Sequence, residues 1–145
     1  MRGRTSSELL SLPVRLRGIQ VGRPLDLLVD PASLRAFGLE VRCGDGASRF
    51  LALAAARIDA DEIAIDSGFA LVDDVAFYRS RGTRLAALRG GRVERGGRGL
   101  GTLKDVRVAS DGTIVSVVAM ARGGEVEVPA AADVRLVERT RAPAA

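Results

Sequence analysis

The stretch from Leu9 to Asp30, LLSLPVRLRGIQVGRPLDLLVD, decides the fold because a second version of it follows. The second version, from Leu88 to Ala109, reads LRGGRVERGGRGLGTLKDVRVA. A constant offset over like-for-like positions indicates a structural repeat, so we expect two related units. The positions that match with one constant difference in residue number are Leu9/Leu88, Val14/Val93, Gly18/Gly97, Val21/Leu100, Gly22/Gly101, Asp26/Asp105, Leu27/Val106 and Val29/Val108.

The length of 145 residues allows two units of roughly 60 to 75 residues each. Units of that size bury only about 60% of their unfolded surface and are marginally stable alone. We therefore expect the two copies to share an interface, to oligomerise, or both. The predicted boundaries are 8–72 for the first repeat, 73–84 for a connecting helix and linker, 85–138 for the second repeat and 139–145 for a flexible tail.

Alternating apolar residues and closely spaced turns predict short strands. Phe37, Leu39 and Val41 alternate with polar residues or glycine, as in a strand with one buried face. Asp111-Gly112 is a strong hairpin turn because it accepts positive φ. Asp73 or Asp74 is expected to cap a short helix over 75–81. Residues 54–56 are expected to form a short helical turn. The predicted class is all-β, with two tandem small antiparallel β-barrels joined by a short helix.

The composition restricts the chemistry of the core and of the partners. Aromatic residues make up 3% of the chain, so the core must consist of Val, Leu, Ile and Ala. Few aromatics also argue against readers that stack nucleic-acid bases. The net charge of +4 would suit nucleic acid or an anionic surface. Because Lys104 is the only lysine, codon usage in a GC-rich genome is the better explanation of the arginine excess.

No catalytic group of residues is evident in the sequence. The chain has no histidine and one cysteine, Cys43, so it holds no plausible zinc site, Ser–His–Asp triad or Cys–His pair. A Ser–Lys dyad would need Lys104, which lies in the repeated strand. A glycine-rich segment, 97–101, precedes a strand pattern rather than a helix, so it lacks the phosphate-binding context. We therefore expect no enzyme activity, no cofactor, no metal and no small-molecule substrate.

Neither end of the chain reads as a targeting or membrane segment. The longest apolar run, Phe50–Ala56, is far shorter than the ~20 residues that span a bilayer. Pro13, Arg15 and Arg17 interrupt the leucines near the start before they reach signal-peptide length. The expected location is cytoplasmic, which also suits an unpaired cysteine.

Charged residues are segregated in the middle of the chain. Every charged residue from Ile58 to Tyr78 is acidic, whereas 79–98 carries arginines against Glu94 alone. These blocks could pair within the chain, between the repeats or across a dimer, or they could be two solvated faces. The candidate interaction surface is the basic block: Arg79, Arg81, Arg84, Arg89, Arg92 and Arg95.

The signature of the repeat is a glycine followed four residues later by an aspartate. It comprises Gly22 with Asp26 and Gly101 with Asp105. The two aspartates could be paired acids, but equivalent positions after a glycine favour carboxylates that accept backbone N–H groups at a strand bend.

At these residues the chain resembles the PRC-barrel family, the small β-barrel of the photosynthetic reaction-centre H subunit and of the C-terminal part of a ribosome-maturation factor. The matching segments are Val21–Asp30 and Leu100–Val108, and the resemblance covers most of 9–136. The second copy matches better, since Val128-Pro129 stands where the family often has Val-Pro and Leu53 stands opposite Pro129 in the first copy. The resemblance implies a six-stranded barrel that serves as an interaction module without enzymatic activity.

Two functions remain open at this stage. The first is a non-catalytic adaptor that binds another protein or a second copy of itself as a homodimer. The alternative is an RNA- or ribosome-associated module that uses the arginine-rich segment 79–98.

Overall fold

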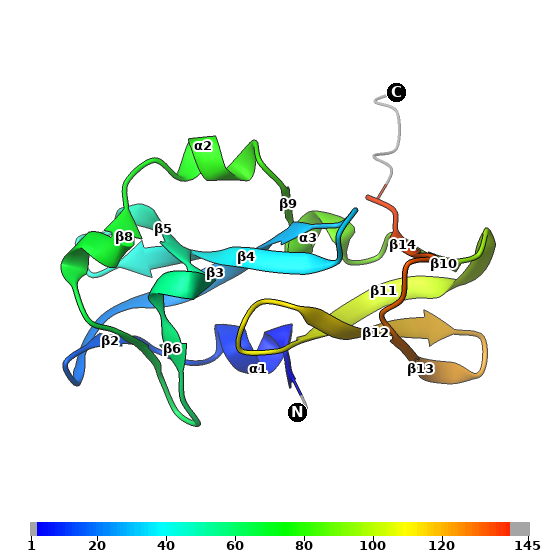
Figure 1. Ribbon diagram of the computed structural model, residues 1–145, viewed down its shortest axis with the longest axis horizontal. Helices are drawn as coiled ribbons and strands as arrows, with labels where there is room; N and C mark the ends of the chain where they lie inside the picture. Colours follow the sequence, from blue (N-terminus) through cyan, green and yellow to red (C-terminus); the bar gives the residue numbers. More distant parts are fainter. Residues whose placement is uncertain (1–2, 140–145) are drawn as a thin grey trace.

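The computed structural model describes residues 3–139, which form two β-sheets with three short helices (Figure 1). The first sheet has the strand order β6 (Arg57–Ile58), β7 (Ile63–Ile65), β2 (Val14–Leu16), β3 (Ile19–Asp30), β4 (Arg35–Cys43), β5 (Ser48–Ala52), β8 (Leu71–Val72), with β9 (Thr83–Arg84) also on β3. The second sheet has the order β13 (Gly124–Pro129), β12 (Ile114–Ala121), β11 (Arg98–Val108), β10 (Arg92–Arg95), β14 (Val134–Leu136), with β1 (Arg4–Thr5) also on β11. The predicted all-β class is confirmed.

The sheets differ from the prediction of two closed barrels. Each sheet is an open series of strands, since within 3–139 the end strands β6 and β8, or β13 and β14, are not paired with each other. The physical reason is that one apolar cluster contains buried residues of both repeats, from Leu9 to Leu136. The open side of each unit is covered by the other repeat, so closure on itself is not needed. The expected interface between the copies is therefore present as a common core of mostly aliphatic side chains.

The long strands β3 and β11 carry the same irregularity at equivalent positions. The sequence predicted separate strands at 19–21 and 25–29, whereas β3 runs through both. Its pairing with β4 shifts register between Pro24 and Asp26, and the pairing of β11 with β12 shifts at the equivalent place, between Leu103 and Asp105. A bulge of this kind accommodates the extra residue and lets one strand continue.

The N-terminal arm of each repeat pairs with the long strand of the other repeat. β1 places Arg4 opposite Val108 on β11, and β9 places Thr83 opposite Val29 on β3. In the alignment of the repeats Arg4 corresponds to Thr83 and Val29 to Val108, so the crossing is reciprocal. Residues 73–84, predicted as a helix and linker, thus include the β9 arm in addition to the helix α2 (Val75–Arg79).

A second reciprocal contact joins the tips of the equivalent hairpins. Arg35 and Thr113 form an antiparallel bridge between the β3–β4 and β11–β12 hairpins. The Ala36 N–H donates to the Gly112 carbonyl at 2.7 Å, and the Ile114 N–H donates to the Leu34 carbonyl at 3.1 Å. Ala36 corresponds to Ile114 and Leu34 to Gly112 in the two hairpins, so an approximate twofold axis passes through this bridge.

Three helices are present within 3–139, of which the sequence predicted one. α2 follows its predicted cap, since the Asp74 carboxylate accepts the Phe77 N–H, and the expected turn at 54–56 is a 3₁₀ turn, Leu53–Ala55. A further 3₁₀ turn covers Gly68–Ala70. The helices α1 (Ser6–Leu10) and α3 (Leu85–Leu88) are too short to have a periodic pattern, and each follows a crossing arm.

Most of the predicted tail, 140–145, lies outside the described residues. Arg139 is described, and its N–H donates to the carbonyl of Ala87 at 3.1 Å. None of the helices in 3–139 has the length and hydropathy needed to cross a membrane.

Candidate functional site

The repeated aspartate of the second copy receives the start of helix α1 from the first copy. Asp105 is almost fully buried and accepts hydrogen bonds from the backbone N–H groups of Ser6 and Ser7 at 3.1 and 3.3 Å. The hydroxyls of both serines also donate to it, that of Ser7 at 2.7 Å. The N–H of Val106 donates at 2.7 Å, which confirms the expected strand-bend contact. Asp105 therefore joins the two repeats.

The equivalent carboxylate of the first copy, Asp26, performs the reciprocal contact with fewer donors. The N–H of Leu27 donates to it at 2.8 Å, again as expected at the bend, and the N–H of Ala86 in α3 also donates to it. The counterparts of Ser6 and Ser7 are Leu85 and Ala86, which have no hydroxyl. Asp26 instead has the Arg84 guanidinium at 3.8 Å.

The pKa values of the two aspartates move in opposite directions for a visible reason. Burial raises the pKa of Asp26, and the hydrogen bonds and Arg84 do not offset it, while the neighbouring Glu40 carboxylate adds repulsion. Burial also acts to raise the pKa of Asp105, but hydrogen bonds from Ser6, Ser7 and Val106 outweigh it and hold the value low. Equivalent scaffold positions thus hold carboxylates of different proton affinity.

Among the acidic residues of 3–139, Glu40 is the most deeply buried. Its side chain is 2% exposed, it lies opposite Asp26 on β4, and it accepts from Arg79 at 2.7 Å and from Arg84 at 3.3 Å. The hydrogen bond from Arg79 and the charge of Arg84 lower the pKa of Glu40 despite burial. This ion cluster holds α2 and the β9 arm against the outer face of the first sheet.

The predicted interaction surface is dispersed among partners within the chain. Arg89 donates to the Ser6 hydroxyl at 2.8 Å and lies 3.8 Å from Asp105, and Arg81 stacks 4.7 Å from the centre of the Phe77 ring. The other candidates form ion pairs: Arg79 and Arg84 with Glu40, Arg92 with Glu94 at 3.7 Å and Arg95 with Asp133 at 3.6 Å.

The acidic and basic blocks do not meet each other. Within 3–139 no ion pair joins an acid of 58–78 to an arginine of 79–98. The acidic block pairs with arginines that precede it: Asp59 with Arg57, Glu62 with Arg15 and Asp73 with Arg49. Pairing occurs within the chain, but not between the blocks.

The residues set aside as catalytic candidates have structural surroundings. Lys104 forms an ion pair with Glu125. The glycine-rich segment 97–101 begins at the turn after β10, and its residues 98–101 form the start of β11, so no helix follows it. Cys43 is buried at the end of β4, as expected for a small apolar residue.

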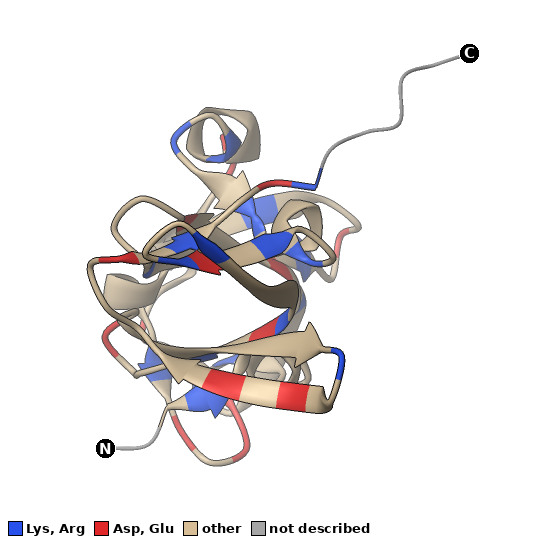
Figure 2. Cartoon of the chain, turned by 90° about the vertical axis from the view of Figure 1, so that its right-hand side faces the viewer, with Lys and Arg blue, Asp and Glu red and all other residues tan. Residues whose placement is uncertain are grey.

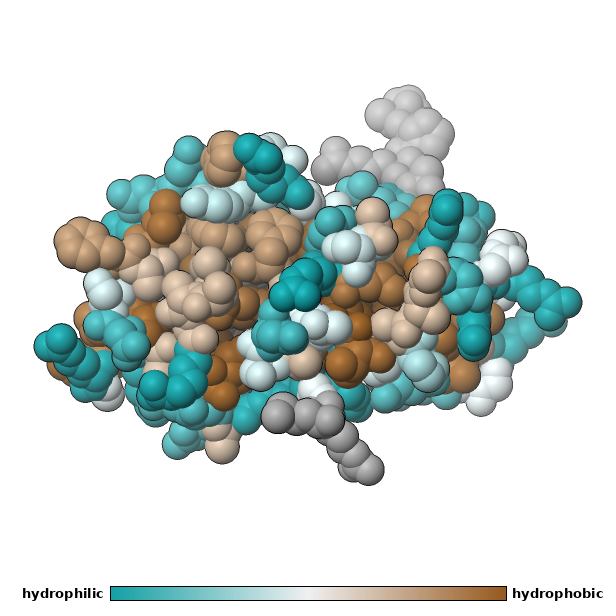
Figure 3. All heavy atoms as spheres, viewed as in Figure 1, coloured by the Kyte–Doolittle hydropathy of each residue, from teal (hydrophilic) through white to brown (hydrophobic). Residues whose placement is uncertain are grey.

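An aromatic cluster covers the outer face of the first sheet. The rings of Phe50 on β5 and Tyr78 on α2 stack at 3.7 Å between centroids with 8° between their planes. Phe77 meets Tyr78 edge to face, and Phe37 packs against Phe50. Figure 3 shows apolar side chains gathered on the half of the molecule formed by the first sheet, where Phe69 is 95% exposed.

The two sheets differ at one edge: in the first sheet a further strand pairs with β5, whereas within 3–139 the equivalent strand of the second sheet, β13, is unpaired on that side. β8 pairs with β5, placing Val72 opposite Phe50 and Leu71 opposite Leu51. β13, the counterpart of β5, is an end strand and has no partner on its outer side among the described residues. Figure 2 shows acidic residues along this strand, where Glu125 forms an ion pair with Lys104 and Glu127 with Arg107. A hollow of about 420 Å³ lies beside it, lined by residues that include Asp105, Val118 and Glu125.

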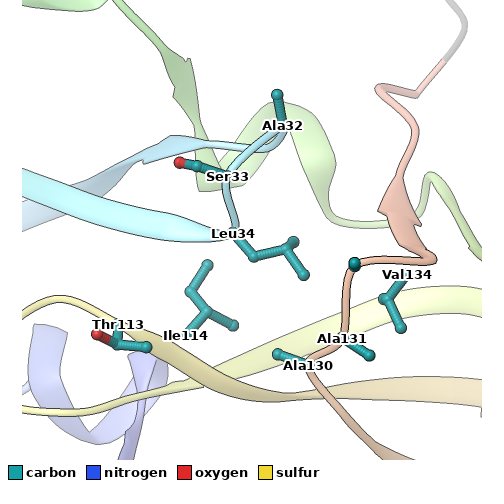
Figure 4. A pocket seen from close by; sticks show the side chains of 9 residues that line it. Ala32, Ser33, Leu34, Thr113, Ile114, Ala130, Ala131 and Val134 are labelled. Carbon is teal, nitrogen blue, oxygen red and sulfur yellow. The ribbon is translucent and has the colours of Figure 1, made fainter.

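A smaller hollow of about 290 Å³ lies at the junction of the repeats (Figure 4). Leu34 from the first repeat and Ile114 and Val134 from the second point toward it, with the hydroxyls of Ser33 and Thr113 at its edge. The sequence did not indicate this hollow, because it exists only where the two hairpin tips meet.

Comparison with known proteins adds no relative: the sequence matches no protein-family model and no curated protein.

Proposed function

We propose that this chain is a non-catalytic protein-interaction module, an adaptor built from two PRC-barrel-like units with a common core. The observation that carries the proposal is the difference between the two sheet edges. β5 is covered by β8 and by α2, whereas β13 and the face beside it are exposed. An unpaired edge strand presents backbone N–H and C=O groups that another extended chain can use.

The register of the first repeat indicates which residues of β13 an added strand would face. Leu51 pairs with Leu39 and Val128 pairs with Val117, so Val128 stands where Leu51 does. By the same register, Glu127 stands where Phe50 does. A segment that takes the place of β8 would therefore meet the apolar side chain of Val128 and the carboxylate of Glu127. That carboxylate already accepts from Arg107 at 3.2 Å and from Ser116 at 3.0 Å, so a basic residue of the partner would join this ion pair.

The proposed partner is an extended segment that pairs antiparallel with β13 and carries Leu or Val opposite Val128 and Arg or Lys opposite Glu127. Opposite charges on facing strands stabilise a sheet, and like charges destabilise it. Self-pairing of two β13 strands centred on Val126 would bring Glu125 and Glu127 of the two copies together. The edge therefore favours a basic partner over a second copy.

Self-association is the second candidate, and it rests on a different surface. Phe69 is 95% exposed and Val72, at the neighbouring sheet edge, is 38% exposed. A large exposed aromatic side chain is typical of an interaction site. A homodimer is proposed through this end of the first sheet. Sedimentation of the chain and of Phe69→Ser tests it, with a lower dimer fraction expected for the variant.

The experiment for the main proposal uses a six-residue peptide, Thr-Leu-Arg-Leu-Arg-Thr. We expect it to slow hydrogen exchange of β13 amides and to bind about tenfold more weakly to Glu127→Lys. Glu138→Lys, which reverses the charge of an exposed residue away from the edge, serves as the matched control. Protection elsewhere but not on β13, or equal binding to both variants, would contradict the proposal.

An RNA- or ribosome-associated role through 79–98 has less support. Six of its seven arginines, all except Arg98, are held by carboxylates or by an aromatic ring, so binding phosphate would compete with existing contacts. A steep decrease of RNA affinity with salt would instead favour that role.

A further inference from the structure

Two arginines of the first repeat face each other without an anionic partner. Arg23 on β3 lies directly opposite Arg42 on β4. Within the described residues neither guanidinium forms an ion pair or a hydrogen bond. Like charges directly opposite on neighbouring strands destabilise a sheet, so this pair costs stability in the free protein.

Both arginines line a surface hollow. Its volume is about 480 Å³, and Arg23 and Arg42 line it together with the apolar residues Val21, Pro24 and Leu25. Leu25 is 42% exposed although it is large and apolar, because it sits at the bulge of β3 between the paired Pro24 and Asp26. The site thus combines two adjacent positive charges with an apolar wall.

The scaffold does not require the arginines. When the two bulged hairpins are aligned, the equivalent cross-strand pair in the second repeat is Thr102 opposite Met120. The same bulged hairpin therefore forms without charge at these positions. A cost that the fold does not require indicates a role for the pair in binding.

We propose that this hollow binds a small organic anion. Its carboxylate or phosphate head accepts hydrogen bonds from both guanidinium groups, and its apolar part lies against Val21, Pro24 and Leu25. Arginine suits this role because its planar fork binds either oxyanion in a bidentate manner and stays charged at every accessible pH. The site lies on the first repeat and is independent of the β13 edge, so it extends beyond the proposed adaptor function.

The test compares hexanoate, hexyl phosphate and hexanol as probes at constant ionic strength. We expect the two anions to shift the Arg23 and Arg42 guanidinium resonances and to raise the melting temperature, with binding in the millimolar range or tighter. Hexanol should do neither. The relative affinities of the two anions identify the head group, and tighter binding of one assigns it.

The variant Arg23→Thr with Arg42→Met installs the residues of the second repeat and should weaken binding at least tenfold, with the fold retained. The control, Arg98→Thr with Arg122→Met, removes two exposed arginines elsewhere and should leave affinity within about twofold. Circular dichroism checks that both variants are folded. Unchanged affinity in the first variant, an equal loss in the control, or no response to either anion at about 10 mM would overturn the proposal.

Discussion

Replacing Asp105 by alanine should destabilise the protein much more than the same change at its counterpart Asp26. Asp105 accepts backbone and hydroxyl hydrogen bonds from both Ser6 and Ser7, which begin α1. Asp26 accepts backbone hydrogen bonds from Leu27 and from α3, and burial raises its pKa. The two changes remove the same side chain from the same scaffold position with different numbers of partners.

The magnitudes follow from those partners. Loss of a carboxylate that accepts N–H groups at the start of a helix costs about 1 kcal/mol, and a buried hydroxyl that loses a charged acceptor costs about 1–3 kcal/mol. Because the backbone N–H groups and the hydroxyls of Ser6 and Ser7 lose their charged acceptor, while the Thr5 cap of α1 remains, Asp105→Ala should reduce the free energy of unfolding by about 3 kcal/mol. Asp26→Ala should cost about 1 kcal/mol, because the change also relieves the repulsion with Glu40.

Urea unfolding followed by circular dichroism at neutral pH measures both values. Ser7→Ala is the second change of a double-mutant cycle with Asp105→Ala. It is a mild substitution, since the second repeat already has Ala86 at this position. In the parent it should cost about 1 kcal/mol, and in Asp105→Ala close to nothing. Equal losses at the two aspartates, or the same cost of Ser7→Ala in both backgrounds, would refute this account of the crossing contact.

Three further changes follow from other contacts. Gly112→Ala should cost about 3 kcal/mol in urea unfolding, because φ is +93° and the added Cβ would lie 2.2 Å from the Ala36 carbonyl oxygen; a neutral result would show that the hairpin tips do not meet. Tyr78→Ala should cost about 3 kcal/mol and increase protease cleavage near α2, because the ring stacks on Phe50 at 3.7 Å. Since burial raises the folded pKa of Asp26 above 3.8, the folded state binds this proton more tightly, and stability falls as pH rises through that folded value. Asp26→Asn should remove this decrease, and parallel pH profiles would contradict it.

The aspartate pair also shows how one repeat signature acquires two sets of properties. Gly22 with Asp26 and Gly101 with Asp105 have the same spacing, and both aspartates lie at the bulge of a long strand. The difference arises from residues far away in sequence, the serines or their apolar counterparts at the start of a helix. Asp26 has a raised pKa and lies beside the Glu40 carboxylate. The charges of Arg79 and Arg84 offset the repulsion between the two acids.

The sequence by itself determined the repeat, the all-β class, the main turns and the aliphatic core. These features depend on residues close together in the chain: alternation predicted β4, Asp-Gly predicted the β11–β12 turn, and a cap at Asp73 or Asp74 predicted the start of α2. The hydrogen bonds of Asp26 and Asp105 to the following residue were predictable for the same reason.

Only the tertiary structure decided how the two repeats are joined. The crossing of β1 and β9, the hydrogen bonds from Ser6 and Ser7 to Asp105 and the bridge between Arg35 and Thr113 link residues that are far apart in the chain. The partners of the arginines were also decided there, because the position of a long charged side chain depends on which buried carboxylate the packing brings within reach. Local patterns specify strands and turns, whereas the choice between a closed barrel and an exchanged arm depends on the apolar surface that each repeat offers the other.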